Sequence, residues 1–146
     1  MKGYLRDATE DDMELLFIWA NDAEVRQNSF STHRITYEEH QQWYQRLLIQ
    51  SDCKQYIYMN DEEPVGQIRI TIVGDSAEIG YSVCAEKRGQ GYGKIMLQML
   101  CEKVRQEFPE IKKLTAKVKP ENRASQKTFE AVGYKEIYHA LEFNVI

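Results

Sequence analysis

The 146-residue sequence has no long hydrophobic run, and this absence bounds where the protein can work. Its longest apolar stretches, such as residues 15–20, are far shorter than the roughly 20 residues that a membrane-spanning helix needs. The first seven residues lack the apolar core of a secretory signal. We therefore expect a cytoplasmic protein that does not associate with membranes.

Basic residues are not in excess, and cysteines are few. The 19 Lys and Arg against 23 Asp and Glu give a net charge of −4, which argues against a nucleic-acid partner. A small polyanionic ligand stays open, because local charge clusters decide its binding. Cys53, Cys84 and Cys101 show neither a CxxC pair nor zinc-ligand spacing. We expect reduced thiols that pack in the core, no disulfide framework and no metal.

The first half of the chain reads as a strand followed by two helices. Residues 2–8 are typical of a strand, and Thr9 with Asp12 forms a helix-start signal. Residues 26–34 are polar and are expected to form a loop. Thr36 and Glu39 predict a second capping box. The side chains expected to face the core from these helices are Leu16, Trp19, Ala20, Ala23, Trp43 and Leu47.

The second half changes to a period of two at residue 55. Alternation predicts strands at 55–59, 65–73 and 77–84, with a turn at 60–64. A helix to about residue 108, a strand at 113–118, a helix at 122–132 and an extended segment at 134–145 follow. The order indicates one α/β domain spanning residues 1–146, with a mixed central sheet flanked by helices. The apolar stripe expected on the helix that ends near residue 108 is Leu97, Leu100, Cys101, Val104 and Phe108.

The most informative segment is the glycine-rich turn at residues 84–94, between a strand and a helix. Unpaired N–H groups at a helix start, together with the helix dipole, form an anion site. The segment carries three basic residues and one acidic residue, a local charge of +2. A pyrophosphate suits such a site. Neither the Walker A loop nor the dinucleotide fingerprint GxGxxG fits the glycine spacing.

The pattern R-x-x-G-x-G at residues 88–93 resembles the acetyl-CoA loop of the GNAT superfamily of N-acetyltransferases. Residues 122–125 and 129–134 resemble the penultimate helix of that family and its Gly-aromatic end. The resemblance implies a GNAT-like acyl-CoA N-acyltransferase fold and an acetyl-CoA-dependent N-acetyltransferase. The alternative is a helix-entry turn whose glycines serve geometry alone.

The resemblance also implies where acetyl-CoA lies. Main-chain groups of Val83 and Ala85 would pair with the pantetheine arm, and the Val83 N–H would donate to the thioester oxygen. Asn122 and Ser125 would lie near the thioester end. The pyrophosphate would rest on the loop formed by Arg88, Gly89, Gln90, Gly91, Tyr92, Gly93 and Lys94.

For catalysis, the family pattern implies direct attack of an amine on the thioester. Glu78 is the candidate base, and its alternative is a solvated strand carboxylate. Many relatives carry a tyrosine in the penultimate helix as general acid, but Phe129 stands at that position here. Tyr138 is the favoured substitute over Tyr81 and Tyr92, although each of the three has the alternative of a packed aromatic. The thiol of coenzyme A ionises well enough that an acid is dispensable.

The acceptor is expected on the N-terminal side. Residues 19–26, 35, 39–40 and 43 resemble bacterial amino-sugar-nucleotide N-acetyltransferases, including those of the pseudaminic acid pathway. Arg26 would pair with a nucleotide diphosphate, and His40 and Tyr81 would line the acceptor pocket. His40 has the alternative of a surface residue on a capped helix.

Other acceptors and another class of function remain open. Polyamines are kept open by acidic pairs at 11–12, 22 and 24, and 38–39, and a protein N-terminus also carries a low-pKa amine. A catalytically silent acyl-CoA-binding module on the same scaffold is favoured by Phe129. A homodimer is left open as well.

Overall fold

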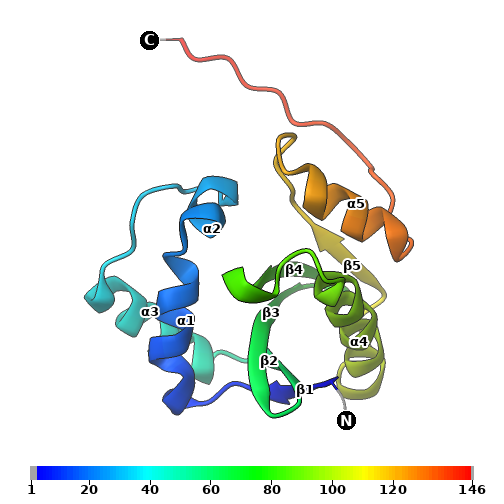
Figure 1. Cartoon of the computed structure of the whole chain (residues 1–146). Coiled ribbons are helices and arrows are strands. Elements are labelled where there is room, and N and C mark those ends of the chain that lie inside the picture. Colours follow the sequence, from blue (N-terminus) through cyan, green and yellow to red (C-terminus); the bar gives the residue numbers. More distant parts are fainter. Residues whose placement is uncertain (1–2, 146) are drawn as a thin grey trace.

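The computed structural model describes residues 3–145 and contains one five-stranded sheet (Figure 1). Neighbouring strands from β1 to β4 are antiparallel, and β5 lies parallel to β4. The expected mixed sheet flanked by helices is thus confirmed. The strands, in their spatial and sequential order, are β1 Gly3–Asp7, β2 Cys53–Asn60, β3 Glu63–Val73, β4 Ser76–Val83 and β5 Lys113–Ala116.

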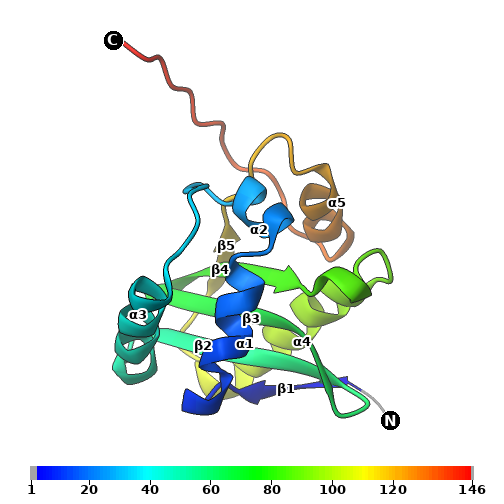
Figure 2. The same cartoon turned by 60° about the vertical axis from the view of Figure 1, so that its left-hand side comes forward.

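Helices cover both faces of the sheet (Figures 1 and 2). One face carries α1 (Met13–Ala20), α2 (Ala23–Asn28) and α3 (Tyr37–Ile49), and a 3₁₀ turn at Glu10–Asp12 precedes α1. The other face carries α4 (Tyr92–Glu107), against which α5 (Arg123–Ala131) packs. A second 3₁₀ turn, Ala85–Lys87, leads from β4 towards α4.

Alternation along the strands sorts apolar side chains between two cores. Tyr56, Ile68 and Ile79 face α4 and pack with its buried residues, among them Leu97 and Leu100. Burying each such side chain contributes about 1.5–3 kcal/mol to folding. The predicted stripe of α4 is confirmed at its buried positions. The smaller core beneath α1 and α3 contains Leu16, Tyr44, Leu47, Ile57 and Met59.

Both predicted capping boxes form, and one of them ties the α1 layer to the sheet. Thr36 and Glu39 exchange backbone and side-chain hydrogen bonds at the start of α3. Asp12 accepts the Thr9 N–H at 2.8 Å and two hydrogen bonds from Arg6 of β1, both also 2.8 Å. These bonds from Arg6 and Thr9 lower the pKa of Asp12 against the opposing effect of burial.

The hairpin between β2 and β3 is tighter than the sequence predicts. Its turn consists of Asp61 and Glu62, which both adopt positive φ angles of 51° and 66°. The expected turn residue Pro64 lies within β3 instead. It pairs opposite a register irregularity at Tyr58 and Met59, which is where a strand accommodates a residue that has no N–H.

Three predictions about the N-terminal helices are wrong. Residues 26–28 of the expected 26–34 loop belong to α2 (Ala23–Asn28), because the Asp22 carboxylate caps the N–H groups of Glu24 and Val25. Trp43 is 36% exposed, whereas Tyr44 is 1% exposed. One residue along a helix rotates a side chain by about 100°, and the stripe of α3 is offset by that step. Ala23 is also exposed.

The predicted extended segment at 134–145 pairs with no strand in the described chain. It leaves the body of the protein beyond α5 (Figures 1 and 2). Tyr138 is 66% exposed there. Alternating apolar residues predict a strand only where a partner edge meets them, and this segment meets none in residues 3–145.

Candidate active site

The loop between β4 and α4 is held open by its backbone conformation. Gly89 and Gly91 have φ angles of 77° and 85°, a region that side-chain-bearing residues rarely adopt. Gly91 caps α4 without a side-chain hydrogen bond, and the first helical bond there joins the Ile95 N–H to the Gly91 carbonyl. The N–H groups of Tyr92, Gly93 and Lys94 consequently lack helical acceptors, as an anion site requires.

Gly93 serves a different purpose from the other two glycines. A Cβ atom at this position would lie 3.2 Å from the ring of Tyr81 on β4. Its lack of a side chain therefore allows the first turn of α4 to pack closely on that ring. Tyr92 is fixed as well, because its hydroxyl accepts a hydrogen bond from Asn60 and its ring lies against Tyr58.

The end of β4 is open on the side of β5. β5 pairs with β4 only from Ser76 to Ile79, so residues 80–83 have no neighbouring strand on that side within the described chain. On the opposite side, the Cys84 N–H donates to the Val65 carbonyl at 2.8 Å. This divergence of the two strands leaves room for an extended ligand arm beside Val83.

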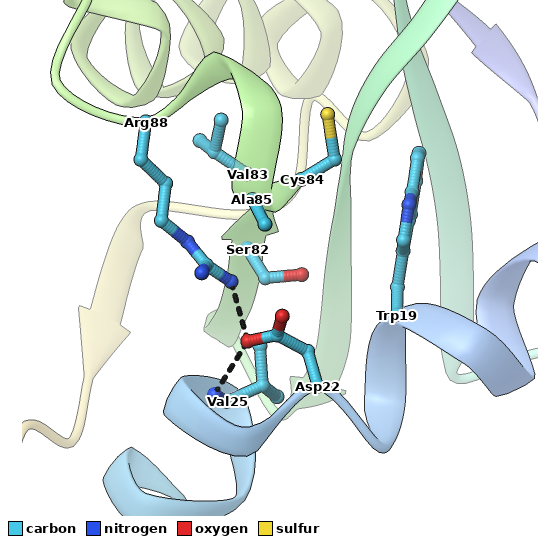
Figure 3. Close-up of a pocket in the computed structure, with 8 residues that line it drawn as sticks. All are labelled: Trp19, Asp22, Val25, Ser82, Val83, Cys84, Ala85 and Arg88. Atoms are coloured by element: carbon cyan, nitrogen blue, oxygen red, sulfur yellow. Dashed lines mark hydrogen bonds and ion pairs between the residues drawn. The ribbon is translucent and has the colours of Figure 1, made fainter.

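Arg88 reaches from the loop to the turn between α1 and α2 (Figure 3). Its Nη2 lies 2.7 Å from Oδ1 of Asp22, and its Nε lies 3.4 Å from Oε2 of Glu24. Partial burial opposes ionisation of Asp22, but hydrogen bonds from Arg88 and from the α2 backbone leave its pKa below the ordinary value. The loop and the N-terminal helices are thus joined by an ion pair.

A cavity of about 190 Å³ lies between the sheet and the N-terminal helices, next to the end of β4. None of its lining residues is an aspartate or a glutamate. The lining residues come from α1–α3, the segment after α2, and β2–β4: Leu16, Trp19, Ala20, Val25, Arg26, Ser29, His40, Trp43, Gln55, Gln67, Arg69, Gly80, Tyr81 and Ser82.

Polar side chains cross the floor of the cavity. Gln55 donates to Gln67 at 2.8 Å, and Gln67 donates to Ser82 at 3.2 Å, which links β2, β3 and β4. The guanidinium carbon of Arg69 lies 5.1 Å from the ring centroid of Trp43. Sequence reasoning missed Gln55, Gln67 and Arg69. The alternation that placed Glu78, Gly80 and Ser82 on one face would have assigned Gln67 and Arg69 to the same face.

Two of the predicted acceptor-side residues line the cavity but are held by their own chain. Arg26 donates to the carbonyl groups of Ala20, Ser31 and His33 and to the Ser29 hydroxyl, so its guanidinium fixes the segment after α2. His40 is 2% exposed, unlike the surface residue considered as its alternative. Burial lowers its pKa, although a hydrogen bond with the Met13 carbonyl opposes the shift.

The two predicted catalytic residues are not brought to the cavity. Glu78 lies on the expected face of β4, but its carboxylate is 3.4 Å from Lys117 and the residue does not line the cavity. Tyr138 belongs to the exposed C-terminal segment. Tyr81, in contrast, lines the cavity, and its hydroxyl lies 3.2 Å from the Ser125 hydroxyl.

The start of α5 adjoins this position. The Asn122 side chain accepts the Ser125 N–H at 3.2 Å and so caps the helix, as predicted. Phe129, at the place of the expected acid, is 7% exposed and makes edge contacts with Tyr81 and Tyr134. Burial raises the pKa of Tyr134 to about 12. Phe129 is therefore a packing residue beside Tyr81.

The family model for an acetyltransferase (GNAT) domain matches residues 4–135. The chain belongs to the GNAT acetyltransferase family. It is accordingly an N-acetyltransferase that takes its acetyl group from acetyl-CoA. A sequence search of curated proteins gave no match. In residues 3–145, no helix is long and apolar enough to cross a membrane, and no group of three metal-ligating side chains could hold a metal ion.

Solved structures of low sequence identity share the fold of this acetyltransferase. Spermidine N-acetyltransferase from Vibrio cholerae, in complex with CoA and spermine, superposes with a TM-score of 0.86 at 16% identity, covering 99% of this chain and 88% of that one. Aminoglycoside acetyltransferase AAC(6')-Ib with coenzyme A gives 0.80 at 23%, covering 91% and 84%. The RimL ribosomal L7/L12 α-N-protein acetyltransferase with CoA gives 0.79 at 22%, covering 91% and 80%.

Proposed function

We propose that this acetyltransferase acetylates the amine of a small acceptor bound in the cavity beneath α1 and α3, and that the acceptor is an amino-sugar nucleotide. The observation that carries the proposal is the lining of the cavity, which has arginine, histidine and amide side chains but no carboxylate. A polyamine or an aminoglycoside is polycationic and would call for carboxylates there.

At least one member of each acidic pair that kept a polyamine open is engaged elsewhere. Asp12 is bound by Arg6, and Asp22 and Glu24 by Arg88. Glu39 belongs to the capping box of α3. These contacts support the amino-sugar nucleotide over the polyamine.

The proposed donor site combines the open end of β4 with the start of α4. Main-chain groups of Val83 and Ala85 would hold the pantetheine arm, and the loop from Arg88 to Lys94, with Gly89, Gln90, Gly91, Tyr92 and Gly93 between them, would hold the pyrophosphate. The support is the set of amide groups without helical acceptors and the divergence of β5 from β4. The Val83 N–H would donate to the thioester oxygen. Asn122 and Ser125 would border the thioester end.

Proton transfer is proposed to need little from side chains. Deprotonating an amine of pKa about 10.4 at pH 7 costs about 4.6 kcal/mol, whereas an amine of pKa about 8 costs only about 1.4 kcal/mol. A hexosamine belongs to the second group, which suits a cavity without a carboxylate base. For the leaving thiolate, we favour Tyr81 as proton donor over Tyr138, because the Tyr81 hydroxyl lies 3.2 Å from that of Ser125, which would border the thioester end.

The test is a thiol-release assay with acetyl-CoA and three amines: UDP-glucosamine, spermidine and a peptide with a free N-terminus. We expect the highest kcat/KM with UDP-glucosamine, measured against acetyl-CoA alone as the hydrolysis control. Preference for spermidine or the peptide would overturn the acceptor class. Tight CoA binding in calorimetry without turnover of any amine would instead support the silent acyl-CoA-binding module.

A further inference from the structure

Arg69 is a cation without a protein counter-ion inside the cavity. Its guanidinium group forms no hydrogen bond or ion pair with any residue in the described part of the chain, 3–145. It stands in the middle of β3, opposite Gln55 on β2 and Gly80 on β4. The carboxylate that influences it is Glu78, which pairs with Lys117 and does not line the cavity.

The surroundings of Arg69 hold its guanidinium group in place. Its guanidinium carbon lies 5.1 Å from the ring centroid of Trp43, which is a cation–π contact and leaves the N–H donors unused by the protein. Gly80 makes room for it, because a Cβ atom at Gly80 would lie 3.3 Å from Nη2 of Arg69. The residue is partly buried, so solvent screens it less than a surface arginine.

The other basic side chains of the cavity, Arg26 and His40, already have hydrogen-bond partners in the protein. Arg26 already makes four hydrogen bonds to its own chain. His40 engages the Met13 carbonyl, and burial lowers its pKa so that it carries no charge at neutral pH. Arg69 is therefore the group in this cavity with a full charge and unused donors. A planar set of N–H donors matches two oxygen atoms of a phosphate or a carboxylate.

We propose that Arg69 recognises an oxyanion of the acceptor, so that the enzyme selects amines that carry a phosphate or a carboxylate group. This inference rests on the proposed function in one respect, namely that the acceptor occupies this cavity. Beyond the proposed function, it names Arg69 as the residue that recognises the acceptor, and it states that the acceptor carries a negative charge. It also gives a physical reason for excluding polycationic amines, since Arg69 repels them.

The test compares amines that differ in one anionic group. Glucosamine has no charged group besides its amine, glucosamine 6-phosphate adds a phosphate, UDP-glucosamine adds a uridine diphosphate, and glucosaminic acid is the open-chain amino sugar with a carboxylate. Binding is measured by calorimetry on protein saturated with coenzyme A, which occupies the loop at α4, and kcat/KM is measured with acetyl-CoA. We expect at least one anionic amine to bind about 10- to 100-fold more tightly than glucosamine. The amine that binds most tightly shows whether the recognised group is a phosphate, a diphosphate or a carboxylate.

Three variants separate recognition from general effects. Arg69→Gln should abolish the preference for the anionic amine over glucosamine, and Arg69→Lys should restore part of it, because lysine keeps the charge but not the planar donors. Arg105→Gln, an equal change of net charge on the exposed face of α4, should alter nothing. Gly80→Ala, which displaces Arg69 by a few tenths of an ångström without removing its charge, should weaken the preference to a smaller degree.

Two results would overturn the inference. One is equal binding of glucosamine and every anionic amine by the wild-type protein. The other is an Arg69→Gln variant that is folded by circular dichroism and retains the preference. Binding that depends on Arg69 without acetylation of any amine would support the inference and contradict the proposed acceptor chemistry, so the two failures are distinguishable.

Discussion

The loop between β4 and α4 presents backbone N–H groups, whereas the cavity beneath α1 and α3 presents side chains from six helices and strands. The loop occupies one continuous stretch of sequence, and its shape depends on Gly89 and Gly91 at positive φ angles. The cavity gathers residues from position 16 to position 82. Binding by backbone N–H groups depends on the conformation of the loop and tolerates most side-chain substitutions. Binding by side chains depends on the identity of each side chain.

Arg88 and Asp22 connect the two halves. Their ion pair joins the loop to the turn before α2, and α2 itself borders the cavity through Val25.

The largest expected effect follows from Gly91→Val. A β-branched residue at a φ angle of 85° costs about 1–3 kcal/mol of strain, which the loop relieves by changing shape. We expect the KM for acetyl-CoA to rise about 10- to 100-fold in steady-state kinetics. Gly74→Val is the matched control, since Gly74 has a φ angle of 64° in the open β3–β4 turn. Equal changes of KM in both variants would refute a backbone-made donor site.

Tyr81→Phe tests the junction of the two halves. The variant keeps the ring that packs on Gly93 and Phe129 but removes the hydroxyl proposed to protonate the thiolate. We expect kcat to fall about 10-fold, less than the usual effect of a general acid because the thiolate of coenzyme A leaves readily, while KM stays unchanged. Tyr138→Phe should leave kcat unaltered. A larger loss in Tyr138→Phe would restore the choice made from the sequence.

The parts of the fold that sequence predicted are those encoded by local signals. Thr9 with Asp12 and Thr36 with Glu39 mark helix starts through bonds between residues three apart, and these form as expected. Alternation in β2–β4 reports which side chains are buried. The glycine pattern of the loop indicated the family, because two of its glycines are required by backbone conformation.

What sequence did not predict depends on partners distant in the chain. Trp43 and Tyr44 are adjacent on α3, and only the packing of α3 against β2 decides which of them is buried. Arg88 was expected to face a ligand, but its side chain forms ion pairs with Asp22 and Glu24, which lie 66 and 64 positions earlier in the sequence. Arg69 was overlooked because its significance is the lack of a counter-ion within residues 3–145, which no local pattern reports.

Asp22→Asn tests whether the ion pair holds Arg88 away from the cofactor. Asparagine keeps a carbonyl oxygen that caps α2 but removes the charge. A partly exposed ion pair is worth about 0.2–1 kcal/mol, so freeing Arg88 should lower the KM for acetyl-CoA by about 1.5- to 5-fold. Glu102→Gln, which breaks an exposed pair on α4, is the control and should not change KM. A rise in KM for Asp22→Asn would mean that the ion pair positions Arg88 for the cofactor.

The smallest effect concerns the neutral state of His40 in the cavity wall. Burial lowers its pKa below the ordinary 6.5, so in mildly acidic solution the unfolded chain binds a proton that the folded protein does not. The resulting stability is fully present above pH 6.5 and is lost as the pH falls towards the lowered pKa, with a slope of at most about 1.4 kcal/mol per pH unit. Urea unfolding between pH 7.5 and pH 5.5 should show this slope in wild type and in the control His139→Gln, whose side chain is exposed. It should disappear in His40→Gln, and an undiminished slope in that variant would mean that groups other than His40 cause it and that burial does not lower the pKa of His40.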